Sequence, residues 1–256
     1  RAIDPAAPPP DAAAAMPIVT LSHDADFDGW RSAARALALA GTPPGEIDWQ
    51  IRARPGRAAT PAATAATGTG FSVPRSFIDL ARTVTCHSDP DRFARLYAAL
   101  LRLRSSPAGA EPDPRCRQLE EMAREVLQAM HETRIAATFV PLGAGERLVG
   151  WFEPRHHVLR VNAGFFARHV PSARWSLLTP RSSLHRDGER LAIGPGADRA
   201  DGAIETIWGG YLANAGNPDG LEAIGALPAD AWKDPSAAAL GSSGAAGDGR
   251  PVGVVD

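Results

Sequence analysis

Hydrophobic positions change their spacing several times along the chain. Ile47, Trp49 and Ile51 alternate with polar residues, which is the spacing of a half-buried strand, and residues 17–21 have a β-rich composition. Between these two runs, the apolar residues from Phe27 to Leu39 follow a helical spacing. The opening of the chain therefore predicts a strand, a helix and a second strand, a unit that brings its two strands together in parallel.

Three amphipathic helices are predicted after this unit. Their apolar stripes run over residues 77–84, 93–103 and 119–130. The second stripe follows Ser88-Asp89-Pro90-Asp91, a favoured helix start with a capping serine and a proline in the first turn. Three such stripes in succession need a common apolar surface, which we expect the later strands to provide.

The second half of the chain predicts two hairpins. Apolar runs at 148–152 and 158–161 flank Glu153-Pro154-Arg155-His156, a predicted turn because proline restricts its own backbone and that of the preceding residue. Residues 184–186 and 190–193 flank Asp187-Gly188, a favoured two-residue turn. The remaining predicted elements are strands at 138–142 and 175–179 and helices at 163–169 and 201–214.

These elements predict an α+β fold: a mixed, largely antiparallel sheet with an N-terminal β-α-β unit and several covering helices. We expect a single domain from about residue 17 to 234, with Trp151, Phe152 and Trp175 at least partly buried. Segments rich in Pro, Ala, Gly and Ser bury too little apolar surface to offset the cost of ordering them. Three such segments are predicted: a disordered leader at 1–16, a flexible loop at 54–70, and a linker or disordered tail at 235–256.

Composition argues against several classes of protein. The formal net charge is −2, so any nucleic-acid binding must rest on a local basic patch. Cys86 and Cys116 are too few for a disulfide framework or a zinc knuckle, and they favour a reducing, cytoplasmic location. No apolar run reaches the ~20 residues of a membrane span. The sequence has no Gly-x-Gly-x-x-Gly, Walker loop or His-Glu-x-x-His motif, so no cofactor and no metal site is predicted.

The predicted turn after Phe152 carries the densest group of ionisable side chains in the chain, from Glu153 to His157. Adjacent residues of an extended segment point to opposite faces, so His156 and His157 cannot easily share one ion. The turn could be a surface element, a contact for nucleic-acid phosphate or a metal site, and the residues alone leave these alternatives open. His87, which precedes a predicted helix start, is interpreted as a packing or capping residue.

Four stretches resemble a bacterial family of DNA-metabolism proteins. They are Asp26-Phe27-Asp28-Gly29-Trp30-Arg31, residues 77–104 with their Cys-His-Ser-Asp-Pro junction, Trp151-Phe152-Glu153-Pro154-Arg155-His156, and residues 175–188. Members of that family are DNA-repair-associated proteins encoded beside a radical-SAM partner, or N-terminal domains fused to UdgX-type uracil-DNA glycosylases. The resemblance covers about residues 17–234 and implies a setting in DNA repair. Basic positions of the family are missing between Ala223 and Trp232, so DNA binding is expected to be weak.

Two functions are compatible with these features. The first is a non-catalytic module that binds nucleic acid or a partner and accompanies a glycosylase or radical-SAM repair enzyme. Its predicted basic surface lies around the two hairpins and consists of Arg155, His156, Arg160, Arg168, Arg174, Arg181 and Arg186. The second is an enzyme that acts on nucleic acid or a nucleotide through an acid-base or metal site. Its candidate catalytic residues are Glu153, His156, His131 and His185.

Overall fold

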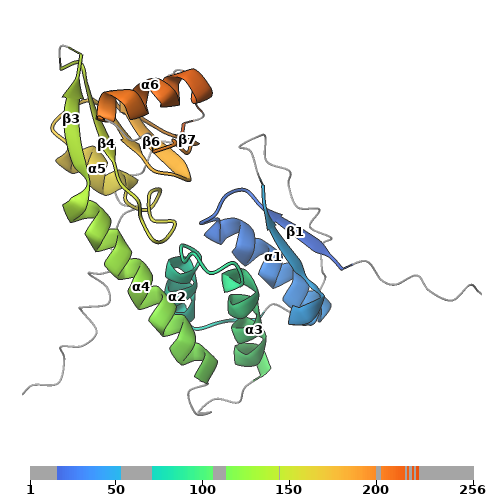
Figure 1. Cartoon of the computed structure of the whole chain (residues 1–256). Helices are drawn as coiled ribbons and strands as arrows, with labels where there is room; N and C mark the ends of the chain where they lie inside the picture. The colour runs from blue at the N-terminus through green and yellow to red at the C-terminus, as the bar shows by residue number, and fades with distance from the viewer. Residues whose placement is uncertain are drawn as a thin grey trace, which may run out of the picture. The chain divides into compact units, whose positions relative to one another are not determined.

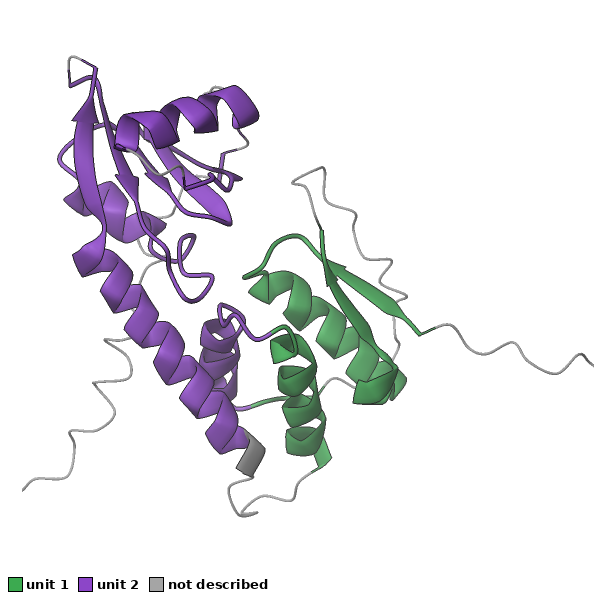
Figure 2. Cartoon of the chain, in the orientation of Figure 1, with its two compact units in different colours: residues 1–73, 90–111 green, residues 74–89, 112–256 purple. Residues whose placement is uncertain are grey.

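The described residues of the chain form two compact units. The computed structural model describes residues 16–52, 71–105, 114–143, 145–199, 203–216, 218, 221 and 223–224. Unit 1 takes its residues from 1–73 and 90–111, and unit 2 from 74–89 and 112–256 (Figure 2). Helices occur together with two separate sheets, so the predicted α+β class is confirmed. The three segments predicted to be disordered, 1–16, 54–70 and 235–256, lie outside the described residues apart from Met16.

Unit 1 begins with the predicted β-α-β arrangement. Strand β1 (Ile18–Leu21) and strand β2 (Asp48–Ile51) pair in parallel, and helix α1 (Phe27–Ala40) connects them together with the short 3-10 helix η1 (Pro44–Glu46). The carboxylate of Asp26 caps α1, since it accepts hydrogen bonds from the backbone N–H groups of Ser22 and Gly29 at 2.8 Å each. The predicted strand, helix and second strand, with the two strands parallel, are therefore confirmed.

Helix α3 (Arg92–Ser105) completes unit 1. The indole Nε1 of Trp30 donates to the carbonyl of Phe93 at 3.2 Å, and the Trp49 ring lies 6.2 Å from that of Phe93 and 6.0 Å from that of Tyr97. The apolar stripe of α3 is thus buried in unit 1, a different surface from the later strands that were expected to cover it. The helix begins at Arg92, so Ser88 is not its capping residue, contrary to the prediction.

Unit 2 joins two packed helices to a five-stranded sheet. Helix α2 (Arg75–Val84) packs beside the long helix α4 (Pro114–Ala136), which runs directly into the sheet (Figure 1). The strands, in spatial order, are β3 (Thr138–Leu142), β4 (Arg147–Trp151), β5 (Arg174–Leu178), β6 (Ser182–Asp187) and β7 (Arg190–Pro195). Within this sheet, only β4 and β5 pair in parallel, and the other neighbouring strands are antiparallel. Among the described residues, no helix is both long and apolar enough to cross a membrane.

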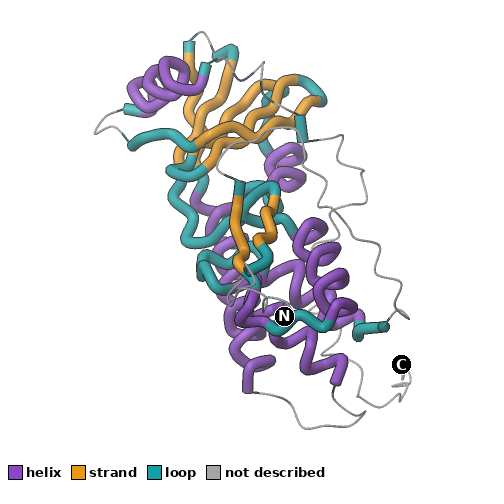
Figure 3. The backbone as a smooth tube through the Cα atoms, turned by 90° about the vertical axis from the view of Figure 1, so that its right-hand side faces the viewer, coloured by secondary structure: helices purple, strands orange, loops and turns teal. Residues whose placement is uncertain are grey.

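One helix covers each face of this sheet (Figure 3). The helices are α5 (Ala163–His169) and α6 (Ile204–Ala215). Alternate residues of a strand point to opposite faces. Accordingly, Trp175 and Leu177 of β5 pack with Phe166 of α5, whereas Leu178 packs with Tyr211 of α6. Trp175 is fully buried, and Trp151 and Phe152 are half-buried, as predicted.

Of the two predicted hairpins, the structure confirms one. Strands β6 and β7 form a tight hairpin, in which Asp187 pairs with Arg190 and Gly188 has a φ of 61°. The hairpin predicted around Glu153-Pro154-Arg155-His156 is wrong. Strand β4 ends at Trp151, and residues 152–162 form a loop with no second strand. Residues 158–161 lie instead in a turn that leads into α5.

Candidate functional site

Three segments of unit 2 bring together two histidines and a glutamate. His87 follows α2, Glu125 lies within α4, and His156 lies in the loop between β4 and α5. Atom Nε2 of His87 is 3.0 Å from Oε2 of Glu125, and Nε2 of His156 is 3.9 Å from the same oxygen. The two imidazole rings lie against each other with centroids 4.2 Å apart. We call these three residues the His–Glu–His cluster.

Hydrogen bonds to the segment just after α2 and to α4 hold the loop that carries His156. The backbone N–H of His157 donates to the carbonyl of Cys86, just after α2, at 2.8 Å. The side chain of Asn162 accepts from Nε of Arg134 at 2.8 Å and donates to the carbonyl of Met130 at 3.2 Å, which ties the end of the loop to α4. In Figure 1 this loop lies at the end of α2. These non-local bonds replace the strand pairing that the sequence predicted.

The hydrogen bonds at the far side of each ring define which nitrogen carries the proton. Atom Nδ1 of His156 accepts from the backbone N–H of Ser88 at 3.1 Å and lies 3.0 Å from the Ser88 hydroxyl. Atom Nδ1 of His87 accepts from the backbone N–H of Asp89 at 2.9 Å. A nitrogen that accepts a hydrogen bond cannot itself carry a proton, so both protons are inferred to lie on Nε2. Both Nε2–H groups therefore face the carboxylate of Glu125.

The surroundings keep His156 neutral. Burial lowers its pKa below the usual value, the nearby charges of His87, Arg155 and Arg181 act in the same direction, and Glu125 opposes them. Only 8% of the His156 side chain is exposed. At neutral pH the cluster thus holds a neutral imidazole whose Nε2–H group is available as a hydrogen-bond donor.

Glu125 is held in its charged form. Its pKa is lowered, first by the hydrogen bond from His87 and further by electrostatic interactions with the two histidines and with Arg124, while burial opposes the shift. In contrast to the two histidines, 61% of the Glu125 side chain is exposed. The cluster is therefore an anionic, solvent-facing carboxylate that rests on two buried imidazoles.

The cluster contains the donor types of a metal site, but its hydrogen bonds oppose one. Two His Nε2 atoms and one carboxylate oxygen lie within 4.8 Å of one another. A neutral histidine that binds a metal through Nε2 carries its proton on Nδ1 and donates it to an acceptor. Here Nδ1 of both rings faces a backbone N–H, from Ser88 and Asp89, which would repel that proton. The observed arrangement is suited to donate hydrogen bonds to an anion.

We expect acidification to destabilise the protein through His156. Because its folded-state pKa is lowered, the unfolded chain binds the proton more readily, so the contribution is complete above the usual pKa of 6.5 and declines as the pH falls towards the folded-state pKa. Each pKa unit of depression corresponds to about 1.4 kcal/mol once the pH is below both values. Urea unfolding across this range measures the effect. His156→Asn, which keeps an acceptor near Ser88 but does not titrate, should flatten the profile, and a profile parallel to that of the wild type would refute the assignment.

A basic rim lies around the cluster and consists of the exposed Arg124, Arg155 and Arg181 together with the half-buried His157. Arg155 follows the carboxyl end of β4 and Arg181 that of β5. The carboxyl ends of two neighbouring parallel strands lie at the same edge of a sheet, so these two arginines are brought near each other. Atom Nη1 of Arg181 is 3.5 Å from Nε2 of His157.

The other arginines of the predicted basic surface have different surroundings. Arg174 forms an ion pair with Asp187 at 3.1 Å. Arg186 donates to two main-chain carbonyls. Arg160 is half-buried, and Arg168 is exposed on α5. Of the seven residues predicted for nucleic-acid contact, His156 is therefore a member of the cluster, and Arg155 and Arg181 belong to its basic rim.

The four candidate catalytic residues are not gathered at one place. Glu153 accepts a hydrogen bond from Arg199 at 3.1 Å, His131 is exposed on α4, and His185 is buried in β6. Of these four candidates, only His156 belongs to a group of three potential metal ligands among the residues that the structure describes. The acid-base or metal hypothesis would therefore have to use a different set of residues.

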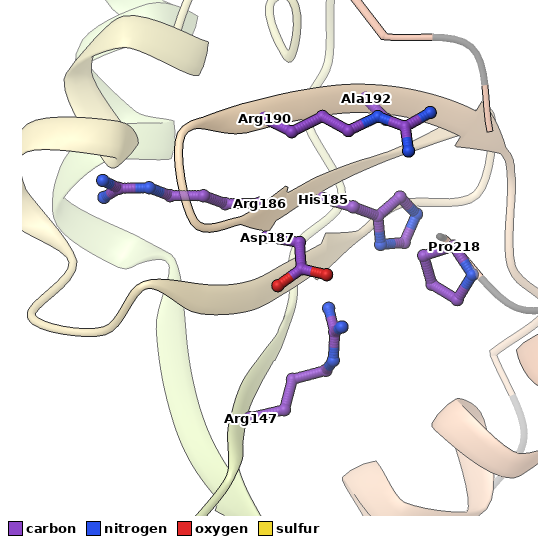
Figure 4. A pocket seen from close by; sticks show the side chains of 7 residues that line it. All are labelled: Arg147, His185, Arg186, Asp187, Arg190, Ala192 and Pro218. Atoms are coloured by element: carbon purple, nitrogen blue, oxygen red, sulfur yellow. The ribbon is translucent and has the colours of Figure 1, made fainter. Parts of the chain in front are cut away.

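His185 forms a second polar network beneath α6. Its Nδ1 lies 2.8 Å from Oγ of Ser176, and its Nε2 lies 2.8 Å from Oγ of Ser183 and 2.9 Å from the hydroxyl of Tyr211. Arg147 donates to Ser176 at 3.2 Å, and it lines a small pocket together with His185 (Figure 4). Each nitrogen of the imidazole has a hydroxyl partner, as in a histidine that stabilises a protein interior.

Two members of the His–Glu–His cluster were not identified as site residues from the sequence. His87 was interpreted as a packing or capping residue, although it lies in the Cys-His-Ser-Asp-Pro junction, one of the stretches that carry the resemblance. That junction meets the stretch containing His156 in the structure. No sequence pattern distinguished Glu125 as a site residue, because it is one of several charged residues on α4.

The fold and the cluster define an α+β protein in which one long helix and two loops present a carboxylate supported by two imidazoles. The chain belongs to a family described as a domain of unknown function, DUF4130, whose model matches residues 90–224. The matched segment includes Glu125, His156 and the five-stranded sheet, whereas His87 precedes it. No curated protein and no solved structure gives a significant match to the chain.

Proposed function

We propose that the chain is a nucleic-acid-binding module that acts in DNA repair beside a glycosylase or radical-SAM enzyme, and that its basic rim contacts phosphate groups. The observation that carries the proposal is the placement of Arg155 and Arg181, from separate segments, beside the buried imidazole of His156. The planar guanidinium of arginine matches the oxygens of a phosphate in a bidentate way. The DNA-repair setting rests on the resemblance of the four sequence stretches.

The protonation of the cluster supports binding over catalysis. A general acid must carry a proton that it can release near the working pH, yet the lowered pKa of His156 leaves it neutral. A general base is most effective when its pKa lies near the working pH, whereas the pKa of Glu125 is lowered. As a general base the neutral His156 has no free nitrogen, because its Nδ1 already accepts from the backbone N–H of Ser88 and its Nε2 carries the proton. The enzyme hypothesis is therefore the less favoured alternative.

We expect weak, strongly salt-dependent DNA binding, because the net charge of −2 leaves only a local patch to neutralise phosphates. If Arg124, Arg155 and Arg181 each contact one phosphate, log K should fall against log salt on duplex DNA with a slope of about −3. The double variant Arg155→Ala with Arg181→Ala should reduce the slope to about −1 and weaken binding by about tenfold or more at low salt. Fluorescence anisotropy of labelled single- and double-stranded DNA measures both quantities.

A matched control is Arg174→Ala, since Arg174 is also exposed but is paired with Asp187. This variant should keep nearly the wild-type slope. Absence of binding at low salt would remove the DNA proposal, and equal losses in the double variant and the control would place the contact elsewhere. Metal-dependent cleavage of either DNA would support the enzyme alternative.

A further inference from the structure

We propose that the His–Glu–His cluster is a phosphate-binding site which the carboxylate of Glu125 occupies in the free protein, and that a phosphate group displaces this carboxylate on binding. The inference rests on the proposed function and specifies its ligand chemistry: a phosphate monoester or diester oxygen takes the position of Oε2. Glu125 is then a competing internal ligand.

The two imidazoles provide the donors of such a site. Their Nε2 atoms face one point, the Oε2 atom of Glu125, at 3.0 Å for His87 and 3.9 Å for His156. Backbone N–H groups of Ser88 and Asp89 hold the rings from behind and fix the Nε2–H tautomer. Donors that are fixed before the ligand arrives bind an anion without having to reorganise. Oε2 of Glu125 accepts a hydrogen bond from His87 and lies 3.9 Å from Nε2 of His156, and a phosphate oxygen at the same position is also an acceptor for such donors.

The burial of the three residues differs in the way that displacement requires. The side chains of His87 and His156 are only 11% and 8% exposed, so the donors remain in place. The side chain of Glu125 is 61% exposed and can rotate into solvent. Its departure alone would leave buried N–H groups without an acceptor, which is unfavourable. The site therefore requires an anion, but not this particular one.

The basic rim favours a phosphate over the internal carboxylate. Arg155 and Arg181 lie close enough to act on the charge state of His156, and Arg124 acts on Glu125. A phosphate that reached the imidazoles would also contact the guanidinium groups at the rim, and bidentate contacts of this kind are among the strong hydrogen bonds. In the free protein, phosphate binds only to those molecules in which the Glu125 carboxylate has left the site. The apparent affinity for phosphate is therefore the intrinsic affinity multiplied by the fraction of such open molecules.

The test is a gain of binding in Glu125→Ala, compared with Glu121→Ala. Both glutamates are exposed on α4, both variants remove one negative charge, and alanine favours a helix, so both variants should fold. We expect Glu125→Ala to bind labelled single-stranded DNA and inorganic phosphate about tenfold more tightly, as for a site that is open about a tenth of the time in the wild type. Glu121→Ala should gain only about twofold, from its charge alone.

A second measurement follows the rings directly. In the wild type, phosphate should shift the ¹⁵N resonances of His87 and His156 at Nε2 while the proton stays on that atom. Adding His156→Asn to Glu125→Ala should remove most of the gain, because one of the two donors is lost.

The outcomes separate this inference from the proposed function. Equal gains in Glu125→Ala and Glu121→Ala overturn the displacement, whereas the proposed function stands if the Arg155 and Arg181 variants still weaken DNA binding. Failure of both the wild type and Glu125→Ala to bind DNA or phosphate overturns both proposals. If Zn²⁺ shifts the ring resonances in the wild type and no longer does so in Glu125→Ala, the cluster is a metal centre and the inference is wrong.

Discussion

Replacing Trp175 by alanine is expected to lower the free energy of unfolding by about 3 to 5 kcal/mol. The Trp175 side chain is 0% exposed, and its ring lies 5.9 Å from that of Phe139 and 6.2 Å from that of Phe166, both in edge-to-face contact. Truncation removes the buried surface of the indole and leaves a cavity between the sheet and α5. Urea unfolding, followed by circular dichroism, measures the loss.

The matched variant is Trp175→Phe. Atom Nε1 of Trp175 is buried without a hydrogen-bond partner among the described residues, so phenylalanine removes a costly donor while it keeps an aromatic ring in the cluster. This variant should lose less than Trp175→Ala, because phenylalanine leaves a smaller cavity than alanine does. DNA binding by its folded form should not change, because a fully buried indole cannot stack on a base. Loss of binding at wild-type stability would contradict the structural role of Trp175.

Replacing His185 by leucine is expected to lower the free energy of unfolding by about 2 to 4 kcal/mol. The imidazole is the common partner of the hydroxyls of Ser176, Ser183 and Tyr211, and leucine would leave these buried groups incompletely bonded. Tyr211→Phe is the milder comparison, since it removes one hydroxyl and should lose about 1 kcal/mol. Thermal and urea unfolding of both variants test the order of the two effects.

This experiment also decides between a structural and a ligand-binding role for His185. If the residue stabilises the sheet, the folded fraction of His185→Leu keeps wild-type affinity for DNA. A variant that is as stable as the wild type but does not bind DNA would assign His185 to a ligand site, as the sequence-based enzyme hypothesis proposed.

The parts of the fold that the sequence predicted well depend on local signals. The alternation of Ile47, Trp49 and Ile51 indicated β2, and Asp187-Gly188 indicated the turn between β6 and β7. Each of these signals acts within a few residues, because backbone geometry and side-chain direction are set there. The prediction of α+β class followed from adding such elements together.

The incorrect predictions involve residues whose partners are distant in the sequence. Residues 158–161 have the apolar content of a strand, but a short apolar run does not distinguish a strand from a buried turn. The backbone N–H of His157 bonds to Cys86 instead of to a neighbouring strand. Ser88 is a residue type that often caps helices, yet its N–H and hydroxyl are directed to His156, 68 residues away.

The site was predictable only in part for the same reason. His156 and Arg155 were found because ionisable residues are dense in that stretch. His87 and Glu125 are separated by 38 residues and meet only through the packing of α2 on α4. A sequence shows which side chains can donate, accept or titrate, whereas the folded chain determines which of them face each other.

The parallel pairing of β4 and β5 places exposed connections after both strands, and the amino-acid sequence of these connections can change in evolution faster than that of the strands. The strands carry the buried residues, such as Trp175 and Leu177, whose shapes are constrained by their neighbours. The connections after β4 and β5 carry the exposed Arg155 and Arg181 and contribute no strand of their own. Loops of this kind tolerate insertions and exchanges that a sheet does not. Relatives could therefore acquire different ligand preferences by altering these two connections, while inheriting the same sheet.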